Sequence, residues 1–449
     1  MQRNGPGIVR VIQNMRGMES GKRSILSVID EYFGTYGDLV DIKLGPVRIF
    51  LTRNPEHIRH CLQENHMNFG RSISYKFLAY FLGQGLLTSE GDLWRKQRRL
   101  AQPAFHRQKI AGFGSIISRA GDELIKSWEN KTNCSLSEEM SHVALAIVSR
   151  ALFGTDLHDE SEAIGRALAI ALDEVNRRSI SLLNPPMFLP TKRNRAYRAS
   201  VSEMDRIAYN IIENREMKQA QQASAGTESS PEDLLGMFLA ARDAESGEAM
   251  SRKQIRDELI TMIMAGHETT ANALCWTIYL LMKHPEIDSR LRAEIQTIGS
   301  DVSLEDLARV PYLQMVIEES MRLFPPVPGL ERLALGDAEL GGVKIPKGSI
   351  VNLVTFAAHR HPGFWDNAES FKPERFATAN ASMRRDQYFP FGGGPRMCIG
   401  NHFAMLEAQI LLVKILRAYR FEFAGEEPLP QIQVTLRPHN GMPVKLVRI

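Results

Sequence analysis

The chain has 449 residues, of which 43% are hydrophobic and 24% are charged, and its formal net charge is +3. This composition allows a large buried core and argues against a chain that is disordered throughout. The small net charge, with no dense Lys and Arg tract among aromatic residues, argues against a nucleic-acid-binding protein. The four cysteines are widely separated and show neither a disulfide framework nor zinc spacing, so we expect a reducing compartment.

No part of the sequence is apolar over the ~20 residues that a membrane span requires. Residues 1–25 are polar and glycine-rich, which is unlike a secretory signal. We therefore expect a soluble, cytoplasmic monomer without a transmembrane segment. The proline-containing apolar stretch 180–190 is the one candidate for membrane contact, and a loop over an apolar pocket is its simpler interpretation.

The predicted elements are mainly helical, with short strands near both ends of the sequence. In chain order we expect strands at 39–44 and 47–51, a helix at 54–63, mostly helices over 110–280, a surface loop at 219–233, and short strands at 340–345, 350–353 and 432–447. Pairing of the strands from the two ends would close one domain over residues 1–449. The pattern alone leaves a two-domain arrangement open.

A long helix is expected to begin at Ser251, which can form a capping box with Gln254, and to end before a proline at residue 285. Its centre carries Ala265-Gly266-His267-Glu268-Thr269-Thr270. Threonine can bond a carbonyl one turn back, and glycine allows the helix to open, so we expect an acid beside a hydroxyl in a groove. A kinked core helix is the alternative.

The segment Phe391–Gly400 places Cys398 in a glycine-rich loop before an amphipathic segment, residues 401–421. The positive end of a helix dipole stabilises a thiolate, and glycines let the backbone approach a flat partner and point N–H groups at sulfur. This loop is typical of one that holds a thiolate on a metal.

Three shorter motifs carry little meaning alone. Trp94 and Arg98, four apart on an expected helix, suit an anionic group, although an ordinary basic helix has the same pattern. Glu319 and Arg322 form an i,i+3 pair that is usually a solvated ion pair. The segment 373–376 (Pro-Glu-Arg-Phe) is a loop when taken alone.

In this order and spacing, the five motifs together resemble those of the cytochrome P450 family, over roughly residues 33–449. The resemblance implies the P450 fold, mainly α with a minor β part: a triangular prism of helices with small sheets. It places haem b between the long central helix and the helix after the cysteine loop.

The resemblance also implies roles for individual residues. Cys398 would be the axial thiolate of the haem iron, which favours O–O cleavage, and Phe391 would shield its sulfur. The other residues expected to contact the cofactor are Trp94, Arg98, Arg332, Arg396, Gly400 and Ala265. Glu319, Arg322 and Arg375 would form a buried structural network.

Glu268 and Thr269 match the acid–alcohol pair that relays protons in dioxygen activation. This match implies a monooxygenase that uses O2 as co-substrate. A peroxygenase or peroxide isomerase of the same fold, and more remotely a haem sensor, are the alternatives. Electrons would come from a separate ferredoxin or flavodoxin with its reductase, attracted by Arg95, Lys96, Arg99 and Arg107.

The segments that match the family's pocket walls are 72–86, 173–189, 262–269, 327–330 and 434–436, and the lining that they offer is apolar with no clear charged anchor. We therefore expect a hydrophobic substrate such as a terpenoid, a fatty acid or a similar lipid. The pocket residues named by this comparison are Phe77, Phe81, Leu82, Leu183, Met262, Val327, Leu330 and Leu436.

Overall fold

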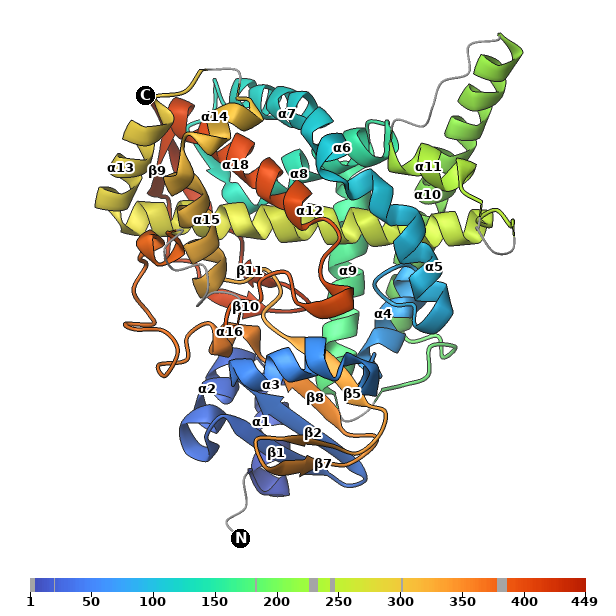
Figure 1. Ribbon diagram of the computed structural model, residues 1–449, viewed down its shortest axis with the longest axis vertical. Helices are drawn as coiled ribbons and strands as arrows, with labels where there is room; N and C mark the ends of the chain where they lie inside the picture. Colours follow the sequence, from blue (N-terminus) through green and yellow to red (C-terminus); the bar gives the residue numbers. More distant parts are fainter. Residues whose placement is uncertain are drawn as a thin grey trace.

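One long helix, α12 (Arg252–Lys283), runs across the helical part of the molecule, and a strand-rich part near the amino terminus lies below it in Figure 1. The computed structural model describes residues 5–19, 21–181, 184–225, 233–242, 247–299, 302–377 and 386–449. No helix in these ranges is both long and apolar enough to cross a membrane.

Most of the described residues lie in α-helices. They are α1 (Ile8–Glu19), α2 (Ile25–Tyr36), α3 (Pro55–Arg59), α4 (Ser74–Leu82), α5 (Gly91–Ala101), α6 (Arg107–Gly112), α7 (Gly114–Ser127), α8 (Leu136–Phe153), α9 (Ser161–Ile180), α10 (Lys192–Ser224), α11 (Leu234–Ala240), α12, α13 (Pro285–Ile295), α14 (Leu304–Ala308), α15 (Pro311–Leu323), α16 (Thr355–Ala358) and α18 (Asn401–Ala418). Short π and 3-10 turns include η1 (His60–Glu64), η4 (Pro373–Phe376) and η6 (Gly394–Arg396).

The strands form small sheets. They are β1 (Leu39–Leu44), β2 (Val47–Thr52), β3 (Phe69–Gly70), β4 (Asn133–Ser135), β5 (Leu330–Ala334), β6 (Ala338–Leu340), β7 (Val343–Ile345), β8 (Ile350–Leu353), β9 (Tyr419–Phe423), β10 (Pro430–Ile432), β11 (Leu436–Pro438) and β12 (Pro443–Arg448). The largest sheet has the order β1-β2-β8-β5-β3. Parallel pairing of β2 with β8 joins strands 300 residues apart, which confirms that strands from the two ends of the sequence pair.

Several predicted boundaries are confirmed, and three need correction. β1 and β8 have their predicted bounds, and the Ser251–Gln254 capping box is present. The strand predicted at 340–345 is instead the β6–β7 hairpin. The loop predicted from residue 219 starts too early, because α10 continues to Ser224; residues 226–232 lie outside the described residues. The helix predicted over 401–421 ends at Ala418, where β9 begins.

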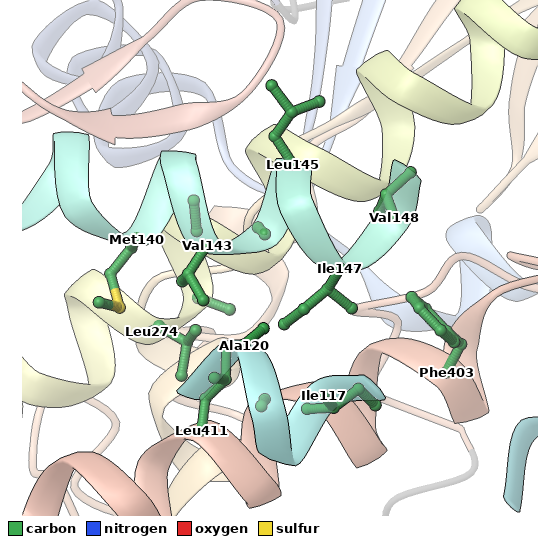
Figure 2. Packing of buried hydrophobic residues seen from close by; sticks show 14 of the residues in the cluster. Ile117, Ala120, Met140, Val143, Leu145, Ile147, Val148, Leu274, Phe403 and Leu411 are labelled. Atoms are coloured by element: carbon green, nitrogen blue, oxygen red, sulfur yellow. The ribbon is translucent and has the colours of Figure 1, made fainter. Parts of the chain in front are cut away.

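The main core lies where α7, α8, α12 and α18 meet (Figure 2). Ile117 of α7, Ile147 of α8, Leu274 of α12 and Leu411 of α18 are all buried there. Helices that share one large apolar core hold their relative positions firmly. This core therefore fixes α12, which carries the segment Ala265–Thr270, and α18, which follows the cysteine loop.

Candidate active site

The middle of α12 is accessible on one side although most of the helix is buried. Ala265 is exposed, and Gly266, Glu268 and Thr269 are half-buried, whereas residues 255–264 and 270–278 are buried. An exposed residue halfway along a buried helix borders an accessible space inside the fold. The acid and the alcohol predicted from the sequence both lie at this turn of the helix.

Thr269 makes the predicted bond, but the helix does not open. The Thr269 hydroxyl donates to the Ala265 carbonyl at 2.6 Å. α12 remains helical from Arg252 to Lys283, and a Cβ on Gly266 would lie 2.8 Å from Cγ2 of Val148. Gly266 therefore serves close packing of α12 on α8. The predicted groove comes from this local exposure and not from a break in the helix.

Glu268 accepts a hydrogen bond from the hydroxyl of Thr435 at 2.7 Å. Burial raises the pKa of the Glu268 carboxyl, whereas the Thr435 bond and the charge of Arg437 oppose that rise. Thr435 lies far along the chain from α12, in a segment that was matched to a pocket wall, and its contact with Glu268 was not predicted.

The cysteine loop holds Cys398 in a defined and accessible position. The Cys398 N–H donates to the Phe391 carbonyl at 2.9 Å, which closes the loop, and the side chain is exposed. A Cβ on Gly394, at φ +66°, would lie 1.8 Å from the Leu62 carbonyl oxygen, so this glycine allows the loop to press on η1. The close contact that Gly394 permits is therefore with the backbone of Leu62.

The surroundings of the sulfur act on its ionisation in opposite directions. The crowded protein environment raises the pKa of the Cys398 thiol, whereas the Gly400 N–H and the charge of Arg98 lower it. Gly400 is also the residue from which α18 begins. The N–H groups at that helix start and the nearby guanidinium are the features expected to stabilise a thiolate.

The predicted anion-binding residues meet at one rim beside this loop. Trp94 and Arg98 lie on α5 as expected, and Arg98 donates to the Met397 carbonyl at 2.9 Å. The Arg396 guanidinium lies 4.4 Å from the centroid of the Trp94 ring and donates to the Ser89 carbonyl at 3.0 Å. The structure thus joins a helix and a loop that are about 300 residues apart in sequence.

Two further residues at this rim, Arg71 and Tyr75, were not predicted as cofactor contacts. Arg332 is buried on β5, and burial together with the charge of Arg71 lowers its pKa. Burial lowers the pKa of Arg396 to about 10, and the charges of Arg71 and Arg332 add to this. The Arg71 Nε atom is buried without a hydrogen-bond partner. This concentration of cationic groups, offset by Glu90, calls for an anionic partner.

Comparison with known proteins identifies the family. The "Cytochrome P450" family model matches residues 4–445. The chain is 32% identical over 416 residues to cyclooctatin synthase of Streptomyces melanosporofaciens, which covers 91% of this chain and 89% of that protein. The chain belongs to the cytochrome P450 family.

Two further similarities agree with this assignment. This P450 is 32% identical over 444 residues to echinocystic acid 23-monooxygenase of Saponaria officinalis, covering 94% of this chain and 84% of that protein. The crystal structure of the cytochrome P450DA heme domain matches with a TM-score of 0.82 and 25% identity, over 99% of this chain and 94% of that one. The chain is a cytochrome P450 monooxygenase with the P450 fold.

The P450 family uses a haem with a thiolate ligand, and the residues at this site fit that group. Haem carries two propionates, and an unpartnered Arg71 Nε in a cluster with Arg332 and Arg396 suits two carboxylates. The accessible sulfur of Cys398, with N–H donors and a cation beside it, suits an anionic metal ligand. The cationic cluster and the cysteine sulfur therefore both suit haem.

The predicted structural network of this P450 is present and buried. Arg322 donates to Glu319 through Nε at 2.7 Å and Nη2 at 2.9 Å, and both side chains have 0% exposure. Nε of Arg375 donates to the same carboxylate at 3.3 Å. The interpretation of Glu319 and Arg322 as a solvated pair is excluded, and the network joins α15 to the segment around η4.

The predicted pocket residues divide into two groups. Phe77, Val327 and Leu330 are half-buried, and Met262 is buried with 6% exposure. Three others expose no surface to a cavity, so they pack behind the wall in this structure: Phe81, Leu82 and Leu436. Leu436 is turned into a separate cluster with Leu26 and Phe356, because alternate residues of β11 face opposite sides. Leu183 lies outside the described residues.

Two carboxyl groups of α12 anchor the segment between α4 and α5, beside the apolar wall. Asp257 accepts from the Gln84 N–H at 2.8 Å, and Glu258 accepts from the Leu86 N–H at 3.1 Å. Glu258 is fully buried, its other oxygen has no partner, and burial raises its pKa to about 8. Glu258 is therefore a protonated acid at neutral pH.

We expect the stability of this P450 to fall with rising pH because of Glu258. An acid whose pKa is raised by folding contributes stability that is complete below its unfolded pKa, near 4.3, and is lost as the pH rises through about 8. Urea unfolding at pH 6 and pH 9 should show a loss of about 2–3 kcal/mol that Glu258→Gln removes. The exposed Glu162→Gln variant on α9 is the control. An equal pH dependence in all three proteins would contradict this prediction.

Proposed function

We propose that this P450 inserts one oxygen atom from O2 into a C–H bond of a hydrophobic small molecule. The observation that supports this most directly is the placement of Glu268 and Thr269 at the accessible turn of α12, beside the exposed Ala265. An acid next to a hydroxyl at the accessible part of a buried helix suits proton delivery into an enclosed site.

In this proposal Cys398 is the thiolate ligand of haem b. The cofactor, when bound, supplies the dioxygen activation and oxygen transfer that no side chain can perform. Arg98, Arg332 and Arg396, together with Arg71, would hold its propionates by charge-assisted hydrogen bonds. The Gly400 N–H donates to the sulfur and limits its basicity, and Phe391 shields it from water.

The proton path uses the two α12 side chains. The Thr269 hydroxyl holds its proton on the Ala265 carbonyl at rest, so it must rotate to donate into the site. Glu268 is the titratable group next to it, and its partial burial keeps its pKa above the ordinary range. A carboxyl beside a hydroxyl at this accessible turn can both give and recover a proton.

Thr269→Ala is expected to uncouple electron consumption from product formation. Reductant should still be used, while product per reductant falls by about tenfold or more and peroxide accumulates, because positioned proton transfer contributes roughly 10²–10⁴-fold to such steps. Thr269→Ser keeps the hydroxyl and is the matched control. Product, peroxide and reductant would be measured in the same reaction.

Two outcomes would count against the proposal. Unchanged coupling in Thr269→Ala would mean that protons reach the site by another path. Turnover with peroxide but never with O2 plus reductant would assign the protein to the peroxygenase or peroxide isomerase class.

The substrate class is proposed from the wall and from the relatives. Phe77, Met262, Val327 and Leu330 are apolar, and burial of apolar surface is the main attraction that such a wall offers. Terpenoid substrates fit this chemistry and agree with the echinocystic acid named for one relative; fatty acids and similar lipids are the next choice. A screen of such ligands by haem absorbance would rank them.

A separate acidic electron donor is the proposed redox partner. A hollow of about 1040 Å³ lies over α5, η3 (Gln102–Phe105) and α6, next to Arg98. Its lining includes Arg95, Arg99 and Lys109, and Arg107 is exposed nearby. A ferredoxin or flavodoxin with negative charge around its cofactor would be steered to this basic surface.

A further inference from the structure

The carboxyl group of Glu268 is tied to a distant part of the chain. The Thr435 hydroxyl donates to Glu268 at 2.7 Å, and the Asn272 amide donates to the Thr435 oxygen over 3.4 Å. Thr435 and Asn272 are both buried. These two hydrogen bonds, from Asn272 to Thr435 and from Thr435 to Glu268, therefore link two turns of α12 through the turn between β10 and β11.

The direction of donation in these two hydrogen bonds affects the ionisation of Glu268. An amide nitrogen can only donate, so its bond occupies the hydroxyl oxygen of Thr435 as acceptor. The hydroxyl proton is then directed at Glu268, and a donated hydrogen bond favours the ionised carboxylate over the neutral acid. Arg437, on β11 just after this turn, acts in the same direction through its charge, whereas burial acts against both.

Thr435 is held firmly enough to act as an anchor. The next residue, Leu436, donates its N–H to the Pro326 carbonyl at 2.9 Å, and its carbonyl accepts from Nε1 of Trp276 at 3.0 Å. The Thr435 carbonyl accepts from the Gln433 N–H at 2.9 Å, which fixes the turn. β11 contacts α12, and Figure 1 shows it beside the middle of that helix.

We infer that Thr435 is a positioning residue, which holds the Glu268 carboxyl in its resting orientation and couples it to the β10–β11 turn. The inference rests on the proposed role of Glu268 in proton delivery. Val434, beside Thr435, belongs to a segment matching a pocket wall, so a substrate that moves this turn also moves the anchor of the acid. Glu268 must exchange its bond to Thr435 before it can serve the site.

Thr435→Val keeps the shape of the side chain and removes the hydroxyl. The variant lacks the hydrogen bond that favours the ionised carboxylate of Glu268, whereas burial still favours the neutral acid. The titration midpoint of Glu268 should therefore rise by about one pH unit or more, as expected for a lost hydrogen bond to a charged group. The midpoint can be read from the infrared band of the protonated carboxyl in the ferric, substrate-free protein, assigned by its loss in Glu268→Gln. Thr435→Ser should restore the original midpoint.

Two further variants make the test specific. Thr277→Val removes a buried hydroxyl of the same helix that donates to the Ala273 carbonyl at 2.7 Å, and it should leave the midpoint unchanged. Asn272→Leu removes the group that orients the Thr435 hydroxyl, and it should shift the midpoint upward by less than Thr435→Val. During turnover, Thr435→Val should raise peroxide per reductant several-fold, and Thr435→Ser should not.

A midpoint that is the same in Thr435→Val and the wild type, or an equal shift in Thr277→Val, would overturn the inference. The infrared titration needs no turnover, so its outcome is separate from the proposed function. If the wild type forms product with O2 and reductant but Thr435→Val shows no shift, the anchor alone is refuted. If the shift occurs but the wild type is driven by peroxide only, the proposed reaction is refuted and the anchor stands.

Discussion

Cys398→Ala is expected to abolish the thiolate-type absorbance shift of the reduced carbon-monoxide complex. No other side chain in the cysteine loop can take the place of the sulfur, because the Cys398 backbone is fixed to Phe391 and the α18 start points at this one atom. Loss of the thiolate also removes the electron donation that favours O–O cleavage. Oxygen-dependent product formation should therefore fall below detection in the same variant.

The control for this prediction is a cysteine elsewhere in the chain. Cys134→Ala changes a partly exposed cysteine on β4, remote in sequence from the loop, and should leave the spectrum unchanged. Absorbance spectra of the reduced carbon-monoxide complex, taken at equal haem content, distinguish the two variants. A normal spectrum in Cys398→Ala would remove the basis for assigning this residue as the ligand.

Local signals in the sequence predicted helix α12 well. Ser251 and Gln254 form their capping box, and Pro285 follows the helix end, because these effects depend on residues within one turn of each other. β1 and β2 were likewise set by alternation around Gly45-Pro46. Elements of this kind are encoded by their own residues.

Such local signals could not predict contacts between residues that are far apart in the sequence. Arg71 lies in a short irregular stretch before α4, and its place beside Arg332 and Arg396 depends on the five-stranded sheet and the cysteine loop together. Thr435 meets Glu268 only because β11 packs on α12. A single sequence carries no periodic or capping pattern that reports either contact.

Motif chemistry was predicted better than side-chain direction. Trp94, Arg98 and Arg396 meet as expected, whereas Leu436 turns away from the site, because a shift of one position on a strand reverses the face of a side chain. Gly266 shows the same difficulty: a helix glycine can permit a bend or a close neighbour. Only the position of Val148 on α8 decides between them.

Removal of Glu319 is expected to be among the most destabilising single changes in this chain. Its carboxylate accepts from Nε and Nη2 of Arg322, from the Lys372 N–H at 2.8 Å and from Nε of Arg375 at 3.3 Å. Glu319→Ala would leave the fully buried Arg322 guanidinium without its counter-charge. Breaking a buried pair in this way costs about 3–5 kcal/mol.

The other bonds of Arg322 explain why the damage should spread. Its Nη1 donates to the carbonyls of His359 and Ala368 at 2.7 Å each, and Nη2 donates to that of Ser370 at 3.1 Å. These three carbonyls belong to the chain between the end of α16 and the start of η4. If Arg322 turned toward water, it would break its bonds to these three carbonyls. The segment would then lose its anchor, and so would the chain that leads from it to the cysteine loop.

Urea unfolding of the haem-loaded protein, followed by circular dichroism and by haem absorbance, measures this effect. Glu162→Ala breaks an exposed i,i+4 pair with Arg166 on α9 and should cost no more than about 0.5 kcal/mol. Glu319→Gln keeps the shape but removes the charge and replaces one acceptor oxygen with an NH2 donor, so it separates loss of packing from loss of the charge and its acceptor. If Glu319→Ala were no more destabilising than Glu162→Ala, the network would not be holding this part of the fold. If Glu319→Gln were as stable as the wild type, the negative charge of Glu319 would not account for the stability of the network.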